Sequence, residues 1–154
     1  MSLTAQDAIN QAEELILDFC QELPEEEQFE REEKNLDLIL EIMNQVGHAE
    51  FVAALKNDVE PPAMFDCQFY AQLGNKEVAP LLIEGLKSSD HDDVEDAVVG
   101  LCYLETEEGL VECKRALKEK RFYSNDKEEI EDLFEDVLEH VSEEYKDKLL
   151  AILG

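Results

Sequence analysis

The three histidines are the first residues to consider for catalysis or metal binding, and they lie far apart. His48, His91 and His140 have no HExxH frame, which would place two imidazoles on one helix face with a glutamate as the general base. Asp136 and His140 are four residues apart, a spacing that allows a weak metal pair but favours a surface ion pair. The histidines therefore predict no metal centre.

The acidic run at 90–96 has the composition of a calcium loop but not its spacing. Val94 occupies the third ligand position and Glu95 the position that needs glycine, so the run allows only weak, non-specific cation binding. The six glycines form neither GxGxxG nor GxxxxGK, which excludes a phosphate loop. We expect a protein with no enzymatic activity and no cofactor.

The chain is strongly acidic. Forty Asp and Glu residues against thirteen Lys and Arg give a formal net charge of −27, while a hydrophobic fraction of 44% is ordinary for a folded chain. Such a surface repels nucleic acid and anionic membranes and attracts cationic proteins over long range. The charge therefore predicts a basic protein partner, with solubility as the alternative explanation.

The acids gather in three clusters. Nine acids and no Lys or Arg lie in 90–112, ten acids with Lys127 lie in 126–144, and seven acids with Arg31 lie in 22–33. Like charges four residues apart destabilise a helix by about 0.2–0.5 kcal/mol per pair. Because this repulsion is relieved when cations bind, the clusters favour a binding surface over simple solubility.

The cysteines indicate a reduced environment. Cys20, Cys67, Cys102 and Cys113 show no CxxC spacing and fall on apolar faces of expected helices. No basic and apolar leader follows Met1, and no apolar run reaches about 18 residues. We expect four buried thiols in a cytoplasmic protein.

Apolar residues recur at three- and four-residue steps along the whole chain, and no segment alternates with a period of two. We therefore expect an all-α protein whose helices begin at the caps Thr4, Asn75, Thr106 and Ser142, with Ser124 or Asn125 opening the eighth, and with a break at 58–62. The expected helices span 4–23, 25–46, 48–57, 63–73, 75–87, 92–104, 106–120, 125–141 and 142–153.

The chain also repeats itself. Residues 70–87 align with residues 101–118 at an offset of 31 without a gap, and a further step of 31 places Phe51 under Leu82 and Cys113. The repeat further predicts burial of Leu55, Leu86 and Leu117 at equivalent positions. A fixed period of this length indicates stacked helical units.

The segment 73–87, with its apolar-Gly-Asn turn and following Val-x-x-Leu helix, resembles the short HEAT-type repeat. The resemblance implies one α-solenoid domain of stacked antiparallel helix pairs over 1–154. Its clearest repeats would be 63–89 and 92–120, with a degenerate repeat at 25–57 and capping helices at 4–23 and 125–153. Some HEAT-type proteins act as chromophore lyases or handle modified nucleotides, but no residue here supports such an activity.

Two positions depart from the HEAT pattern. Glu95 and Asp96 lie where the family carries an arginine that ties neighbouring units together, and Glu105 replaces the glycine of the turn. We therefore expect the second clear repeat to stack irregularly and to carry a remodelled surface.

The resemblance implies that the second helices line a concave face, with the 90–96 loop at its rim. The acidic residues expected to contact the partner are Glu50, Glu77, Glu84, Asp90, Asp92, Asp93, Glu95, Asp96, Glu108 and Glu112.

The leading hypothesis is a monomeric, non-enzymatic inhibitor or immunity protein. It would neutralise a cationic toxin, such as a nuclease, by electrostatic docking, and would bind neither nucleic acid nor membrane. The alternative is a general repeat scaffold or adaptor whose charge serves solubility and which binds through apolar patches such as Phe122, Tyr123 and the exposed part of the helix at 25–46.

Overall fold

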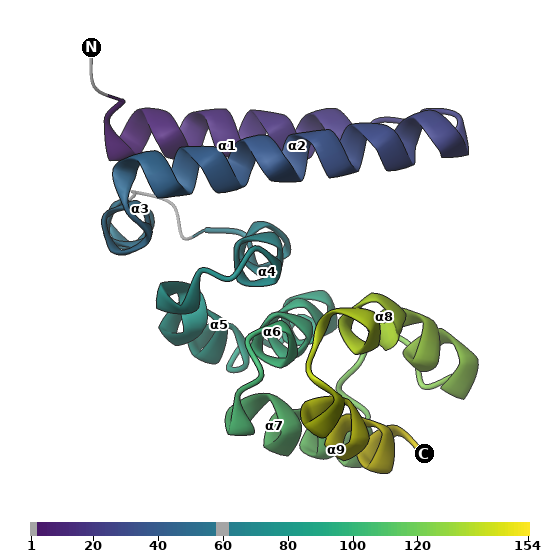
Figure 1. Ribbon diagram of the computed structural model, residues 1–154. Coiled ribbons are helices and arrows are strands. Elements are labelled where there is room, and N and C mark those ends of the chain that lie inside the picture. The colour runs from purple at the N-terminus through teal and green to yellow at the C-terminus, as the bar shows by residue number, and fades with distance from the viewer. Residues whose placement is uncertain (1–2, 58–61) are drawn as a thin grey trace. The chain divides into compact units, whose positions relative to one another are not determined.

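The computed structural model describes residues 3–57 and 62–154, and over these residues the protein is all-α (Figure 1). The described residues form nine α-helices and one short 3-10 helix, with no β-strand. The all-α prediction is confirmed. The predicted break at 58–62 lies outside the described residues except for Pro62.

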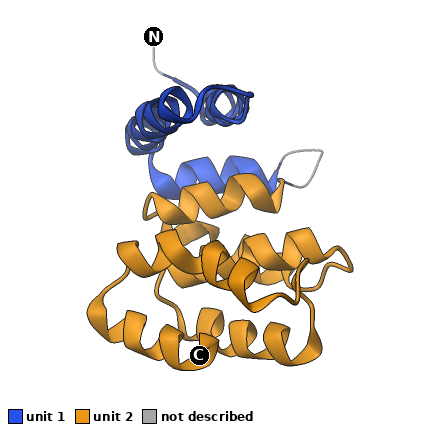
Figure 2. Cartoon of the chain, turned by 90° about the vertical axis from the view of Figure 1, so that its right-hand side faces the viewer, with its two compact units in different colours: residues 1–62 blue, residues 63–154 orange. Residues whose placement is uncertain are grey.

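The chain divides into two compact units, residues 1–62 and 63–154 (Figure 2). The first unit contains α1 (Ala5–Phe19), α2 (Glu25–Val46) and α3 (His48–Lys56). The second contains α4 (Met64–Gln72), η1 (Lys76–Val78), α5 (Ala79–Gly85), α6 (His91–Tyr103), α7 (Glu107–Glu119), α8 (Lys127–His140) and α9 (Glu143–Leu153). A single repeat domain over the whole chain stays a prediction.

In the first unit, α1 and α2 form a long antiparallel hairpin, and α3 packs on both helices (Figure 1). Ile9, Ile39, Met43 and Phe51 are fully buried in this unit. The apolar stripe predicted for each helix therefore forms the core between them.

A polar contact also fixes the hairpin. The amide of the buried Asn35 donates to the Leu15 carbonyl at 2.8 Å and to the Asp18 carboxylate at 3.0 Å. Arg31 donates to both oxygens of the same carboxylate at 3.1 Å. The bonds from Asn35 and Arg31 lower the pKa of Asp18, so the carboxylate that they hold stays ionised.

The second unit is built around α6, on which α4, α5, α7 and α8 all pack. All of residues 97–103 are buried, as is Val94. A Cβ atom at Gly109 of α7 would lie 2.9 Å from the Leu101 backbone and 2.9 Å from the Tyr145 hydroxyl. Glycine at this position therefore allows α7 to approach α6 closely.

The 31-residue repeat is visible in the backbone of two turns. Gly74 and Glu105 both take left-handed conformations, with φ of 89° and 56°. The N–H groups of Asn75 and Thr106, which follow them, each donate to the carbonyl five residues earlier, at 3.0 and 3.3 Å. Both turns thus end a helix in the same way, which the lost glycine does not alter.

Glu105 has a second role that explains why a glutamate suits this turn. Its carboxylate accepts hydrogen bonds from the Ser142 backbone N–H, at 3.1 Å, and from the Ser142 hydroxyl. The contact ties the α6–α7 turn to the start of α9. The loss of the glycine therefore leaves the turn intact, and the irregular stacking expected of the second repeat stays a prediction.

The predicted N-caps are largely confirmed. The side chains of Thr4, Thr106 and Ser142 accept hydrogen bonds from the first turns of α1, α7 and α9, and Asn75 caps η1, which leads into α5. The prediction for α8 is wrong by one residue, because Asp126 accepts the N–H groups of Glu128 and Glu129.

One of the four cysteine predictions is wrong. Helix α1 ends at Phe19 rather than near residue 23, so Cys20 lies beyond the buried stripe and is exposed. Cys67, Cys102 and Cys113 are buried as expected. Burial raises the pKa of the Cys67 and Cys102 thiols to about 12, which keeps both protonated at neutral pH.

The repeat prediction of buried leucines holds only in part. Leu55 is buried in the first unit, whereas Leu86 and Leu117 are half-buried in the second. Leu86 follows the last residue of α5, where the helix end leaves one side of the leucine open.

Arg121 bonds to the chain just before the acidic run at 90–96. Its guanidinium donates to the carbonyls of Leu86 and Ser88, at 2.7 and 3.3 Å, just beyond the end of α5. A cation at this position satisfies carbonyls that the helix leaves unpaired. Arg121 therefore links the end of α7 to the end of α5.

We expect Arg121→Ala to lower the free energy of unfolding by about 1.5–3 kcal/mol, because half-buried carbonyls lose a charged donor. Urea unfolding measures the loss. The matched control is Arg115→Ala, since among the described residues Arg115 pairs with Glu112 and Glu119 of its own helix and with no other acid. An equal effect of the two substitutions would show that the link contributes nothing.

Candidate acidic binding face

The first turns of α6 hold five of the ten acids predicted to contact a partner, which we call the α6 acidic face: Asp90, Asp92, Asp93, Glu95 and Asp96. Part of this run has a local structural reason. Asp90 caps the helix by accepting the Asp92 N–H at 2.9 Å. Acids at a helix N-terminus also interact favourably with the helix dipole.

The loop before α6 fixes one of these acids. The Ser88 hydroxyl donates to the Asp93 carboxylate at 2.8 Å and accepts the Asp90 N–H at 3.1 Å. Asp93 is half-buried, whereas Asp90 and Asp92 are exposed. The start of the face is thus ordered by hydrogen bonds within the chain.

Asp96 is the acid for which no such local reason exists. It is half-buried on α6, one residue before the fully buried Ala97. Burial, which is the largest cause, and the nearby carboxylates of Glu95, Asp92, Asp93 and Asp66 together raise its pKa to about 7 from an ordinary 3.8. The ionised form of Asp96 is therefore costly in the folded protein.

The ionised form of Glu95 is also disfavoured in the folded protein, to a smaller degree than that of Asp96. Partial burial raises its pKa, as do the charges of Asp92 and Glu129, while a hydrogen bond from the Tyr123 backbone and the nearby His91 act in the opposite direction. The carboxylates of Glu95 and Asp96 can each accept hydrogen bonds from a lysine or arginine. An incoming cation would reduce the repulsion within the face.

The other predicted residues are more scattered. In the second unit, Glu77, Glu84 and Glu108 are exposed on η1, α5 and α7, and Glu112 is half-buried on α7. Two of them have local partners, because Glu84 pairs with Lys87 at 3.1 Å and Glu112 pairs with Arg115 at 3.4 Å.

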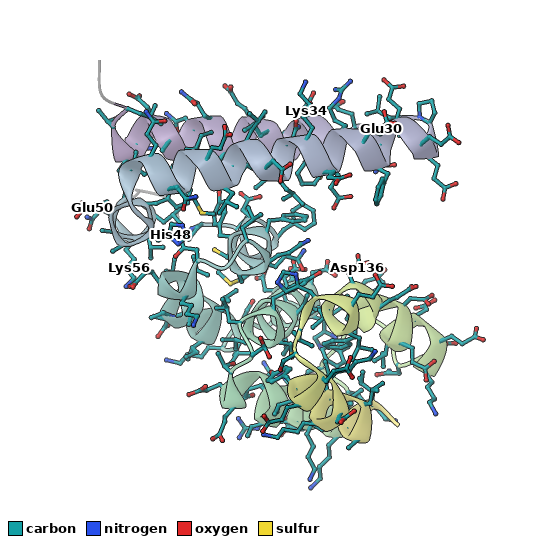
Figure 3. All side chains as sticks on the ribbon, viewed as in Figure 1. Glu30, Lys34, His48, Glu50, Lys56 and Asp136 are labelled. Carbon is teal, nitrogen blue, oxygen red and sulfur yellow. The ribbon has the colours of Figure 1, made fainter. Side chains whose placement is uncertain are left out.

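Glu50 belongs to the first unit. It projects outward from α3 and is exposed (Figure 3). The structure therefore brings together the five residues of the α6 acidic face, and a concave face that includes the remaining five stays a prediction.

Two acids that face this site were not among the residues predicted from the sequence. Asp66 of α4 and Glu129 of α8 both raise the pKa of a carboxyl on α6. Asp66 stands in a largely apolar segment, where a half-buried acid signals a tertiary role. Glu129 lies within an acidic cluster, and only the packing of α8 on α6 distinguishes it from its neighbours.

The expected Asp136–His140 ion pair is wrong. Both residues are described, and no ion pair joins them. The His140 ring instead packs edge-on against Tyr103, with ring centres 5.3 Å apart, while Asp136 lies on the exposed side of α8 (Figure 3). Within 3–57 and 62–154, no group of three or more His, Cys, Asp or Glu side chains is arranged to hold a metal ion.

Phe122 is also not the exposed patch that sequence analysis expected. It is 1% exposed, and its ring lies 6.0 Å from that of Phe134. Tyr123, its neighbour, is 74% exposed. The segment after α7 therefore inserts one aromatic ring into the core and leaves the next at the surface.

No family model, curated protein or solved structure matches this chain. The interpretation of the α6 acidic face therefore depends on its own geometry. No helix in the described part of the chain is long and apolar enough to span a membrane.

The partial burial of Asp96 can be tested by measuring how the free energy of unfolding depends on pH. Between about pH 4 and 7 the folded protein holds a proton on Asp96 that the unfolded chain has released, so this contribution to stability is present at low pH and is lost as pH rises through the folded pKa. We expect Asp96→Asn to raise the free energy of unfolding by about 1–2 kcal/mol at about pH 8, and by much less at about pH 5.

Urea unfolding at the two pH values measures this difference. The control is Asp132→Asn, which removes an exposed acid of α8. A gain that is the same at both pH values, or the same for both variants, would contradict the buried-charge interpretation of Asp96.

Proposed function

We propose that this protein is a non-enzymatic binding module that docks its α6 acidic face on a basic protein, as an inhibitor or immunity protein docks on a cationic toxin. The observation that carries the proposal is the set of half-buried carboxylates Asp93, Glu95 and Asp96 at the start of a core helix. No Lys or Arg lies between residues 90 and 112 to neutralise them.

The physical argument concerns the cost of this arrangement. Acids that serve only solubility lie on exposed positions, where water screens them and their repulsion is small. Asp96 is partly removed from water and is surrounded by like charges, so the folded protein carries a cost that a solvated acid would avoid. A partner's lysine or arginine would convert this cost into binding energy.

The net charge of −27 adds long-range attraction to this local effect. Attraction of this kind speeds association with a cationic partner and weakens steeply as salt rises. A surface of carboxylates also presents the charge that the active site of a nuclease recognises in nucleic acid, which supports a toxin nuclease as one kind of partner.

The helix pairs supply the frame for this surface. We infer that α4–α5 and α6–α7 are HEAT-like repeats of a solenoid. The matching turns at Gly74 and Glu105 support this inference. In such an arrangement the loop from Ser88 to Asp90 lies at the edge of the stack, where a partner can reach the α6 acidic face.

The scaffold alternative has less support after Phe122 is found buried. Its remaining apolar contacts are Tyr123 and Phe29, which are 74% and 67% exposed. It predicts that partner affinity depends on these side chains and not on the acids of α6.

The test compares two sets of neutralised acids on the full chain. The partner is first captured from a host lysate at low salt, purified and titrated by calorimetry. The α6 set is Asp92→Asn, Asp93→Asn, Glu95→Gln and Asp96→Asn. The control set replaces the same number of acids at exposed positions of α8: Glu131→Gln, Asp132→Asn, Glu135→Gln and Asp136→Asn.

We expect the α6 set to weaken binding by about 100-fold and to flatten the salt dependence, and the α8 set to weaken it by about threefold or less. Equal losses would show that net charge alone matters. No loss from the α6 set, with a loss from Tyr123→Ser, would reject the proposal in favour of the scaffold alternative.

A further inference from the structure

A second surface lies in the first unit, on the α1–α2 hairpin. A groove of about 380 Å³ runs between the two helices, and its floor is formed by Leu15 of α1 and by Leu38 and Ile42 of α2. Glutamates line its rim, Glu14 on α1 and Glu41 on α2. Gln11 and Gln45 complete the lining.

The floor residues are distinct from the core of the hairpin. Ile9, Ile39 and Met43 are fully buried, while Leu15 and Ile42 are half-buried and Leu38 is 36% exposed. No residue of α3 lines the groove. The hairpin therefore has a second apolar stripe that no described element of its own unit covers.

The groove continues along α2. A second hollow, of about 390 Å³, shares Leu38 with the first and is lined by Glu30, Glu33, Lys34 and Asp37. Glu30 and Lys34 lie one turn apart on α2 (Figure 3). From residue 30 to residue 45 the two hollows follow α2 for about 22 Å, or about four helical turns.

The dimensions and chemistry of the groove fit a helix better than an extended peptide or a small molecule. The first hollow has an apolar floor and lies between two helices, which is how an amphipathic helix is usually received, and the second hollow extends it along α2 with mostly charged residues. Two adjacent hollows about four turns long match a guest helix of about 15 residues.

The charge around the groove defines the guest further. Five acids border it, against the single base Lys34: Glu14, Glu30, Glu33, Asp37 and Glu41. A second copy of this chain, with its own charge of −27, would be repelled, as would an anionic lipid surface. We propose that the α1–α2 groove binds a cationic amphipathic helix from a partner protein, with leucine-type side chains on the floor and lysine or arginine against the rim.

This inference is independent of the proposed function, because the groove and the α6 acidic face lie in different units of the chain. Either surface can fail its test while the other passes. The groove requires an apolar anchor as well as charge, whereas docking on α6 requires charge alone.

The probe is a synthetic peptide of about 15 residues with leucines at every third or fourth position and lysines elsewhere, and the reference is a scrambled peptide of identical composition. Fluorescence anisotropy with the full chain at about 0.15 M salt measures affinity, and circular dichroism measures helix gain. We expect the amphipathic peptide to bind about tenfold or more tightly than the scrambled one, and to become helical only when bound.

The variant Leu38→Ser removes the residue that both hollows share. We expect it to reduce affinity for the amphipathic peptide by about tenfold, while Leu17→Ser, at a 64% exposed position of α1 outside the groove, leaves affinity unchanged. Glu41→Lys places a positive charge on the rim of the groove and is expected to reduce affinity for the amphipathic peptide. This variant still tests the groove if Leu38→Ser unfolds the hairpin.

Three results would overturn the groove proposal. The first is equal affinity for the two peptides, which indicates non-specific attraction to an acidic protein. The second is equal loss from Leu38→Ser and Leu17→Ser. The third is loss of peptide binding in the neutralised α6 set with none in Leu38→Ser and Glu41→Lys, which would move the peptide to the α6 acidic face.

Discussion

Helix α6 is enclosed by α4, α5, α7 and α8, yet it begins with Asp92, Asp93, Glu95 and Asp96. The packing that removes residues 97–103 from water also removes part of the Asp96 carboxylate. Apolar burial stabilises by about 25 cal/mol per Å², so the long buried stretch can outweigh the cost of one partly desolvated acid. The second unit therefore depends on a helix whose apolar part stabilises it and whose acidic start opposes that stabilisation.

The local features of this fold could be predicted from the sequence because they depend on neighbouring residues. The caps Thr4, Thr106 and Ser142 follow from residue type and position. The offset of 31 residues predicts two equivalent turns, and both take left-handed conformations although one carries Glu105. The loss of the turn glycine led us to expect irregular stacking of the second repeat. The turn itself is kept, because the chain accepts the small strain of a left-handed non-glycine and bonds the glutamate carboxylate to Ser142 at the start of α9.

The features that could not be predicted depend on which helices meet. Nothing near Phe122 indicates that it enters the core while Tyr123 does not, because the segment between α7 and α8 has no periodicity. The candidate site likewise has residues that the sequence predicts and residues that only tertiary packing brings in. Sequence analysis identified the acids of α6 by their density, but Asp66 approaches them from α4 only through tertiary packing. The groove could not be predicted because only the packing of α1 on α2 brings Leu15 beside Leu38 and Ile42.

The two proposed surfaces share one physical principle, in which closely spaced acids repel one another until a cationic guest binds. The proposed docking on α6 depends most directly on Asp96, whose ionised form is disfavoured and would be stabilised by a bound cation. A pH titration of the Asp96 side-chain carboxyl carbon by NMR, without and with an oligolysine peptide, tests this claim. We expect a pKa near 7 for Asp96 in the unbound protein and a clear decrease when the peptide binds. A pKa near the ordinary 3.8 in the unbound protein, or one that the bound peptide leaves unchanged, would contradict it.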